Sequence, residues 1–371
     1  MSDSKESSKP SKPVNKDPEK TGSVNPNYRR VENTTRSVDE YIDGIQNGNK
    51  TLLSRAITLI ESNNPDHQKA GEEILEACLP ASGRSVRVGV TGVPGVGKST
   101  FIESMGRLLL EQKRKLAVLA IDPSSSRTKG SILGDKTRMQ TLSIHDHAFI
   151  RPSPASGTLG GVARKTRETM LLCEAAGYDT IFIETVGVGQ SETAVHSMVD
   201  FFLLLMLAGA GDELQGIKRG IMEMADLIAI NKSEKENIKA AERAKREYEN
   251  ALALMPETSS GWETPVHTCS AIEKTGLDII WKEIEHYLDQ TKKSSYFKQR
   301  RQEQLSQWMN ETIDQELKSR FYHHPAIKAK FQHYEKKVRQ GNMSPFRAAS
   351  RLLALPEKRT GFHDEEVDDR K

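Results

Sequence analysis

Nine residues set the fold class of this chain, and they read Gly92-Val93-Pro94-Gly95-Val96-Gly97-Lys98-Ser99-Thr100. They match the phosphate-loop pattern GxxxxGK[ST]. An apolar run of strand length, residues 86–91, precedes them, and a helical pattern begins near Thr100. Glycines at these positions let successive backbone N–H groups point into one concavity, to which the start of the helix adds positive potential. We therefore predict that all nine residues bind the phosphates of a nucleotide.

Two side chains of this loop carry the expected chemistry. Lys98 supplies a positive charge between the β- and γ-phosphates, and the Ser99 hydroxyl is a ligand for Mg²⁺, which prefers oxygen donors. Because both are intact, a purely structural domain with a degenerate site is disfavoured.

Outside the loop, short apolar runs alternate with helix-length segments as far as residue 270. The expected strands are 86–91, 116–121, 180–183, 201–207, 227–230 and 265–268. Continuous β-rich runs separated by helices are typical of a parallel sheet that is covered on both faces. The fold class predicted is α/β, a P-loop NTPase with a mostly parallel sheet.

The rest of the chain is helical or polar. Residues 37–79 carry apolar positions at helical spacing and predict two or three helices, and the segment after Leu277 becomes helical and strongly charged. The expected organisation is a disordered tail (1–36), an N-terminal helical segment (37–84), a nucleotide domain (85–285), a helical C-terminal arm (286–356) and a polar tail (357–371).

Two acidic residues follow expected strands. Asp122 comes directly after the run 116–121, and Glu184 after 180–183. Ligands of open α/β sheets collect at the carboxyl ends of the strands, so both acids are candidates for the metal. Taken alone, each fits a helix N-cap or a solvated turn equally well. The phosphate loop upstream favours the metal.

The segment after Glu184 has the features of a nucleotide-sensing loop. Gly187 closes an ExxG sequence that is similar to the DxxG of GTPases, in which a backbone N–H meets the γ-phosphate. Gln190 is a candidate for orienting the attacking water, although a lone Gln in a loop is more often merely solvated.

The base is expected after the run 227–230, where the chain reads Asn231-Lys232-Ser233-Glu234. This sequence is close to the NKxD signature for guanine. A carboxylate there accepts hydrogen bonds from the guanine N1–H and 2-amino groups, and Lys232 packs its stem over the ring. Glu234 stands where the signature has Asp and is one methylene longer. We expect a guanine preference, with the backbone of Ser270 and Ala271 also contacting the base.

Composition bears on nucleic-acid binding, on the cellular compartment and on membrane insertion. The chain has 371 residues, 54 basic and 51 acidic side chains and a formal net charge of +3, which gives no reason to expect nucleic acid. Three cysteines without metal-ligand spacing favour a reducing compartment, for which we predict the cytoplasm. The longest apolar run, 201–211, is too short to span a bilayer, and no signal peptide is recognisable.

Several phrases of the sequence go beyond the generic motif and resemble the MeaB/ArgK family. They are residues 56–62, 89–100, 122–126, 130–139, 184–192 and 346–353, and the likeness covers about 37–355. Members are G proteins that associate with the adenosylcobalamin-dependent methylmalonyl-CoA mutase, gate its cofactor loading and protect it from inactivation. Older names call them transport-system ATPases or kinases.

The resemblance implies a role for each matching position. The catalytic set would be Lys98, Asp122, Asp135 and Glu184, and Ser99 with the three acids would hold the metal. Switch segments would be 122–138 and 184–192, a third loop at 208–218 would face the mutase, and the C-terminal helices would form a homodimer. GTP or GDP and Mg²⁺ are the implied cofactors.

Two points stay open. No arginine finger is evident, although Arg127, Arg138 and Arg164 lie in or near candidate mobile segments, so slow hydrolysis is expected. The alternative function is a P-loop kinase or ATPase that acts on a small molecule, such as a component of amino acid transport, with Asp135 or Glu192 as the base. The mutase partner rests on resemblance, and other acyl-CoA mutases with the same cofactor would fit equally.

Overall fold

The structure, a computed structural model, describes residues 36–121, 139–152, 159–185, 191–209 and 219–357. The chain divides into two compact units, Met1–Ser37 and Val38–Lys371. All of the helices and strands given below belong to the second unit.

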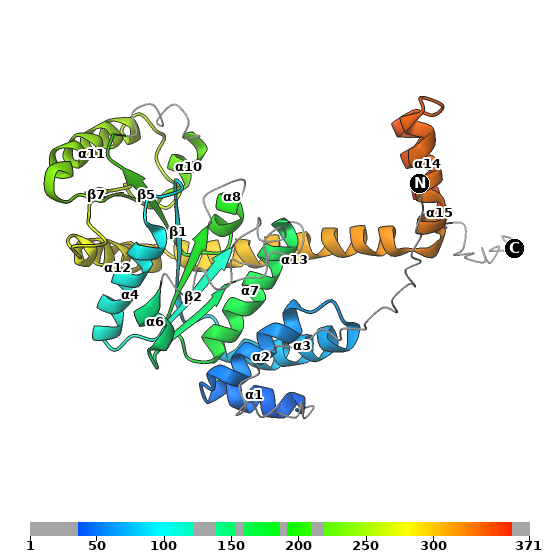
Figure 1. Cartoon of the computed structure of the whole chain (residues 1–371), viewed down its shortest axis with the longest axis horizontal. Helices are drawn as coiled ribbons and strands as arrows, with labels where there is room; N and C mark the ends of the chain where they lie inside the picture. The colour runs from blue at the N-terminus through cyan, green and yellow to red at the C-terminus, as the bar shows by residue number, and fades with distance from the viewer. Residues whose placement is uncertain (1–35, 122–138, 153–158, 186–190, 210–218, 358–371) are drawn as a thin grey trace, which may run out of the picture. The chain divides into compact units, whose positions relative to one another are not determined.

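The centre of this unit is a parallel sheet (Figure 1), as predicted. Its seven strands have the order β3-β2-β4-β1-β5-β6-β7. They are β1 (Val86–Gly92), β2 (Leu116–Ile121), β3 (Ala148–Pro152), β4 (Thr180–Thr185), β5 (Phe201–Leu207), β6 (Leu227–Asn231) and β7 (Val266–Thr268). In the central register Val88 of β1 pairs with Phe182 of β4 and with Phe201 of β5. The phosphate loop therefore leaves the middle of the sheet, with β4 and β5 on either side.

Two details of the predicted strands were wrong. Strand β3 was missed, because Ala148–Pro152 holds Arg151 and Pro152 and pairs only with β2, so it lacks the continuous apolar run of a central strand. Strands β4 and β6 also run further than expected. Glu184 is therefore the last residue but one of β4, and Asn231 is the last residue of β6. Neither residue follows its strand, although the sequence had predicted that both would.

Helices surround the sheet in layers. Their bounds are α1 (Val38–Gln46), α2 (Lys50–Glu61), α3 (Pro65–Cys78), α4 (Lys98–Glu111), α6 (Gln140–Ile144), α7 (Leu159–Ala175), α8 (Ser191–His196), α10 (Arg219–Met224), α11 (Ile238–Leu252), α12 (Leu277–Lys293), α13 (Tyr296–His323), α14 (Pro325–Arg339) and α15 (Pro345–Glu357). The helices expected before the sheet are α1–α3. Among the described helices, none is both long enough and apolar enough to cross a membrane.

Alternating side chains of β5 show how the faces are covered. Phe201, Leu203 and Leu205 belong to a core with α4 and α12, whereas Phe202 belongs to a second core with α7, α8 and the N-terminal helices. Leu204 of the same second face packs with α10 and α11. Helices on both faces bury the sheet, which explains the apolar composition of its strands.

Helix α13 is held to the sheet by a buried ion pair. Two guanidinium nitrogens of Arg301 donate to Asp200, Nε to Oδ1 and Nη2 to Oδ2, both at 2.7 Å, and Arg301 also donates to the carbonyls of Gly83 and Ser85. Asp200 directly precedes β5, and its Oδ2 also accepts from the N–H of Arg87 in β1. The first turns of α13 are therefore attached to the amino ends of two central strands.

Candidate nucleotide site

The phosphate loop depends on three glycines with positive φ. Gly92, Gly95 and Gly97 have φ of 151°, 79° and 95°. A Cβ on Gly92 would come within 2.3 Å of the Leu205 carbonyl oxygen, so no other residue fits between β1 and β5 at this point. Gly97 is the N-cap of α4, and the left-handed turn there directs the chain into the helix behind the loop.

The Lys98 ammonium turns inward onto its own loop. Nζ donates to the carbonyl oxygens of Gly92, at 2.9 Å, and Val93, at 3.2 Å, and the residue is buried. Burial lowers the pKa of Lys98, while the carboxylates of Glu184 and Glu192 act in the opposite direction. A fixed positive charge thus stands in the concavity where a phosphate group would bind.

Ser99 and Glu184 are in direct contact. The Ser99 hydroxyl, on the first turn of α4, donates to Glu184 Oε1 over 2.8 Å. Glu184 is buried near the end of β4, the strand next to β1. A hydroxyl and a carboxylate beside the phosphate loop are oxygen donors of the kind that Mg²⁺ requires, so these two residues fit a magnesium ion.

The expected metal set is only partly placed. Asp122 and Asp135, like Gly187 and Gln190, lie outside the described residues. Within the parts of the chain that are described, no three His, Cys, Asp or Glu side chains gather as a metal site. The hydroxyl of Ser99 and the carboxylate of Glu184 are therefore the donors that the described structure offers.

Asn231 joins the base segment to the phosphate loop. Its Nδ2 donates to the Val96 carbonyl over 2.8 Å, and its Oδ1 accepts from the backbone N–H of Ala271 at 3.1 Å. The Lys232 ammonium donates to the Gly95 carbonyl over 2.8 Å. These bonds join three segments that are distant in the sequence, because Val96 lies 135 residues before Asn231 and Ala271 lies 40 residues after it.

Glu234 is held by Ser270. The Ser270 hydroxyl donates to Glu234 Oε2, and the same hydroxyl oxygen accepts from the backbone N–H of Glu273 at 3.0 Å. Ser104 of α4 fixes the next residue, because its hydroxyl donates to the Ala271 carbonyl over 2.6 Å. Glu234, which stands where the guanine signature has Asp, is thus hydrogen-bonded to Ser270, one of the two residues predicted to contact the base.

Sequence reasoning missed one polar pair beneath this site. The Thr185 hydroxyl at the end of β4 donates to the Thr91 hydroxyl of β1 over 2.9 Å, and both residues are buried. The available signal was a threonine close to the carboxyl end of each of two apolar runs, Thr91 for 86–91 and Thr185 for 180–183. This bond ties the strand that carries Glu184 to the strand that leads into the phosphate loop.

A second set of contacts that the sequence did not reveal joins α13 to the last residue of α8 and to the segment that follows it. His196 Nε2 lies 3.1 Å from Arg300 Nη2, and the Val199 carbonyl accepts from Gln304 at 2.8 Å. Burial and the charge of Arg300 lower the pKa of His196 to about 4. The predicted second switch, 184–192, is thus followed directly by residues that are bonded to the C-terminal helices.

Of the three arginines considered as an intrinsic arginine finger, the described residues include only Arg164, and its contacts do not support that role. Arg164 is bonded to Glu168 on its own helix α7 at 2.8 Å. Arg127 and Arg138 lie outside the described part of the chain.

A comparison with protein families decides which P-loop protein this is. Residues 53–326 match the model for the methylmalonyl-CoA mutase-associated GTPase MeaB. The chain belongs to the MeaB family. The match includes the phosphate loop, the base segment and the Ser270 loop, which are the parts that the structure brings together.

Individual relatives agree with the MeaB assignment. The GTPase ArgK of Escherichia coli is 49% identical over 278 residues, which cover 75% of this chain and 84% of ArgK. The mitochondrial methylmalonic aciduria type A homolog of Mus musculus is 45% identical over 328 residues, 86% of this chain and 79% of the mouse protein. A crystal structure titled LAO/AO transport system kinase superposes with a TM-score of 0.68 at 38% identity and covers 86% of this chain and 97% of its own.

These findings establish the chemistry at a general level. MeaB proteins are P-loop GTPases, and this member has the phosphate loop with Lys98 and Ser99 in place. The chain is a guanine-nucleotide-binding GTPase.

Proposed function

We propose that this MeaB GTPase binds and hydrolyses Mg²⁺-GTP in order to control an adenosylcobalamin-dependent acyl-CoA mutase, of which methylmalonyl-CoA mutase is the first candidate. The nucleotide state would gate adenosylcobalamin loading and protect the mutase from inactivation. The observation that carries the proposal is the family match over residues 53–326, whose description names the mutase. The name of the mouse relative refers to methylmalonic aciduria, which points to the same metabolism.

In this proposal Lys98, Asp122, Asp135 and Glu184 form the catalytic set. The Lys98 ammonium leaves the Gly92 and Val93 carbonyls, which it now contacts, and binds the phosphates. Glu184, together with the hydroxyl of Ser99, holds the metal and its water. A bound Mg²⁺ would neutralise negative charge on the phosphates. Asp122 and Asp135 complete the metal surroundings, and Gly187 offers its N–H to the γ-phosphate.

Guanine would be read by the carboxylate of Glu234. Ser270 holds one carboxylate oxygen, which leaves the other for the N1–H or the 2-amino group of the base. Adenine lacks both donors. A buried acceptor left unpaired is costly, so the selectivity reaches about 10⁴-fold if this site follows the behaviour of hydroxyl-reading sites.

The C-terminal helices would form a homodimer, as proposed for residues 286–356. Four apolar side chains on α13 support this, since about half or more of the surface of each is exposed in a single chain: Leu305, Met309, Ile313 and Leu317. The switch segments 122–138 and 184–192 and the loop 208–218 would carry the nucleotide state to the mutase. The cytoplasm stays the proposed location, which three buried free thiols suit.

Two measurements test the proposal. The first is titration with GTP, GDP and ATP in the presence of Mg²⁺, for which we expect a guanine preference; tighter binding of ATP than of GTP removes the base-reading argument. The second is a pull-down with cobalamin-loaded mutase in the GTP and the GDP state. Association that does not depend on the nucleotide contradicts gating.

The structure titled as a transport system kinase favours a second candidate function, phosphoryl transfer to a small molecule. Asp135 or Glu192 would then be the base. Glu192 is buried at the start of α8. An assay with labelled GTP and a panel of amino acids distinguishes the two functions, because a kinase transfers label to an acceptor whereas a GTPase releases only phosphate.

A further inference from the structure

Both backbone polar groups of Ala271 are bonded to side chains. Its N–H donates to Asn231 Oδ1 at 3.1 Å, and its carbonyl accepts from the Ser104 hydroxyl at 2.6 Å. Neither bond belongs to a helix or to the sheet, since Ala271 lies between β7 and α12. The place of this residue is therefore set by two side chains that lie 40 and 167 positions away in the sequence.

The segment around Ala271 is a tight turn, and we call residues 269–276 the base turn. Ser270 and Thr275 pair across it, because the N–H of each donates to the carbonyl of the other, at 3.1 and 3.2 Å. Gly276 ends the turn with φ of 75°, and a Cβ there would come within 2.6 Å of the last carbonyl oxygen of β7. These contacts give the turn its shape, but they do not fix its distance from the phosphate loop.

Two routes join the base turn to the phosphate loop. One runs through Asn231, whose side-chain amide contacts both Ala271 and the Val96 carbonyl. The other runs through α4, which carries Ser99 in its first turn and Ser104 about 7.5 Å further along its axis, at 1.5 Å per residue. The helix that begins at the phosphate loop therefore also holds the base turn.

Binding of a base would affect the two routes differently. Guanine has an oxygen at its 6-position, to which a backbone N–H can donate, whereas adenine has an amino group there. In the proposed complex the N–H of Ala271 is given to the base, so its bond with Asn231 is exchanged. The carbonyl of Ala271 is a separate group and keeps its bond with Ser104. The Ser104 route is consequently the one that stays intact when the base is bound.

The bond between Ser104 and Ala271 lies in apolar surroundings. The two residues are 8% and 2% exposed, and Ala271 belongs to the core that includes Phe101 and Met105 of α4 and Leu277 of α12. A buried carbonyl that loses its donor is costly, because water does not replace the lost bond in such a place. Loss of the hydroxyl would therefore shift the base turn toward another partner.

This bond orients a whole peptide group. The residue after Ala271, Ile272, is 70% exposed, so the outer side of the base turn is open. A trans peptide is planar, and holding the Ala271 carbonyl against α4 also fixes the direction of the Ile272 N–H, which points the opposite way. The Ser104 hydroxyl thus controls how backbone donors of the base turn are presented.

We propose that Ser104 is a positioning residue for guanine recognition. Its hydroxyl holds the Ala271 carbonyl to α4, so that the base turn keeps the distance from the phosphate loop at which its backbone N–H groups meet the 6-oxygen of guanine. This inference rests on the proposed base site of Glu234, Ser270 and Ala271. It adds a residue, far from that site in the sequence, that sets the geometry of the site.

Ser104→Ala removes only the hydroxyl and tests this role by competition titration. The ligands are GDP, 6-thio-GDP, in which sulfur, a weak acceptor, replaces the 6-oxygen, and IDP, which lacks the 2-amino group. We expect GDP affinity to fall about tenfold, as for the loss of one hydrogen bond, and the preference for GDP over 6-thio-GDP to shrink by a similar factor. The ratio of GDP to IDP affinity should stay the same, because it depends on Glu234.

GTP hydrolysis gives a second readout. Lys98, Ser99 and Glu184 are unchanged in Ser104→Ala, so KM for GTP should rise about tenfold while the single-turnover rate at saturating GTP stays within about twofold of wild type. A tenfold fall of that rate at unchanged KM would place Ser104 among the catalytic groups and overturn the proposal.

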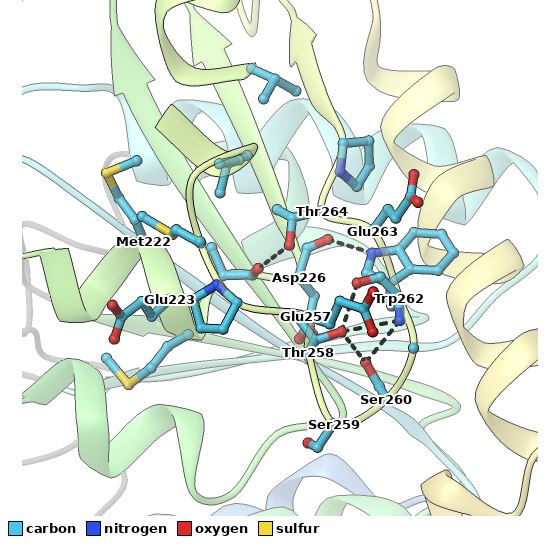
Figure 2. Close-up of a pocket in the computed structure, with 18 of the residues that line it drawn as sticks. Met222, Glu223, Asp226, Glu257, Thr258, Ser259, Ser260, Trp262, Glu263 and Thr264 are labelled. Atoms are coloured by element: carbon cyan, nitrogen blue, oxygen red, sulfur yellow. Dashed lines mark hydrogen bonds between the residues drawn. The ribbon is translucent and has the colours of Figure 1, made fainter. Parts of the chain in front are cut away.

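Thr264 offers a matched control at the other end of the sheet. Its hydroxyl donates to the Ala225 carbonyl over 2.9 Å and so also joins two distant segments (Figure 2). Thr264→Val removes this hydroxyl and keeps the volume, and urea unfolding checks that both variants are folded. The ratio of GDP to 6-thio-GDP affinity should change in Ser104→Ala alone. Equal losses for the two ligands in Ser104→Ala, or the same change of ratio in both variants, would indicate a general destabilisation and overturn the proposal.

Glu234→Gln separates a failure of this inference from a failure of the base site. If Glu234→Gln changes the ratio of GDP to IDP affinity while Ser104→Ala leaves the ratio of GDP to 6-thio-GDP unchanged, the base site stands and Ser104 does not position it. If the wild-type protein distinguishes GDP from neither IDP nor 6-thio-GDP, the proposed base site is wrong as well.

Discussion

Ser99 and Glu184 are joined by a 2.8 Å hydrogen bond at the carboxyl ends of the two central strands β1 and β4. Both residues are proposed ligands of Mg²⁺, so the bond holds two oxygen donors together at the position that the ion would occupy. Loading of Mg²⁺-GTP then requires this bond to open while the same two residues stay in place.

This contact predicts a magnesium-specific defect for Glu184→Gln. The amide can keep a hydrogen bond with Ser99 but loses the negative charge, so we expect GTP turnover to fall by about 10²-fold or more, the usual loss for a group that acts electrostatically in the transition state. The Mg²⁺ concentration for half-maximal rate should rise, whereas GDP binding in EDTA should be nearly unchanged. Equal losses with and without Mg²⁺ would argue against a metal role.

The pairing of Glu234 with Ser270 predicts how the base can be changed. In Glu234→Gln an amide N–H₂ replaces one acceptor, which suits the 2-carbonyl of xanthine and not the 2-amino group of guanine. We expect affinity for GDP to drop by about 10²-fold or more and affinity for XDP to rise, because the side chain at position 234 then mismatches the donors of guanine and matches the 2-carbonyl of xanthine. Competition titrations with GDP, XDP and ADP measure this. Ser270→Ala should give a smaller loss of the same selectivity.

Asp226 and His196, which line the same cavity at the amino ends of β6 and β7, affect stability in opposite ways as the pH changes. Burial raises the pKa of Asp226 to about 6, although Arg300 opposes the shift, and it lowers the pKa of His196 to about 4. Asp226 holds its proton more tightly when folded, so its contribution is lost as pH rises toward 6. His196 holds its proton less tightly when folded, so its contribution is lost as pH falls from 6.5 toward 4. Between pH 4 and 6 the two partly cancel.

Single substitutions should separate these contributions. Asp226→Asn leaves His196 alone, and we expect its stability relative to wild type to rise between pH 4 and 6. His196→Gln should show the reverse trend. Over the whole pH range, each substitution should change the free energy of unfolding relative to wild type by at most about 3 kcal/mol, because one unit of pKa shift corresponds to about 1.36 kcal/mol. Urea unfolding at several pH values measures the difference, and parallel curves for wild type and both variants would refute the assignment.

The ion pair between Arg87 and Glu174 predicts a large cost for removing one partner. Its bonds are 2.8 and 3.0 Å long, and the Glu174 side chain is fully buried. Glu174→Gln leaves the guanidinium without its counter-charge and should lower the free energy of unfolding by about 3–5 kcal/mol. The exposed pair of Arg320 and Glu316 is the control, and Glu316→Gln should cost less than about 0.5 kcal/mol in the same urea titration.

The parts of the fold that the sequence revealed are those governed by local chemistry. The phosphate loop was recognisable because glycines 92, 95 and 97 must have positive φ, a requirement written directly into residue type. The central strands were equally clear, since a strand buried on both faces is apolar throughout. Guanine binding followed from Asn231 to Glu234 and is supported by the family match.

What the sequence concealed depends on pairing between distant segments. Strand β3 has only a short apolar run because it is five residues long and pairs with β2 alone, and its Arg151 extends to Glu61 of α2. Arg300 contacts His196, which is 104 positions away in the sequence, and Asp226, which is about 70 positions away. No spacing rule within a single chain points to such partners. The cavity that His196, Asp226 and Arg300 line could consequently not be predicted from the sequence.

The two edges of the sheet have a consequence for solubility. Strand β3 ends in Pro152, which has no N–H to offer, and β7 at the other edge is three residues long. Short edges and prolines are the devices by which sheets avoid adding strands from neighbouring molecules and growing into aggregates. Both edges of the sheet therefore offer few free backbone groups to an additional strand.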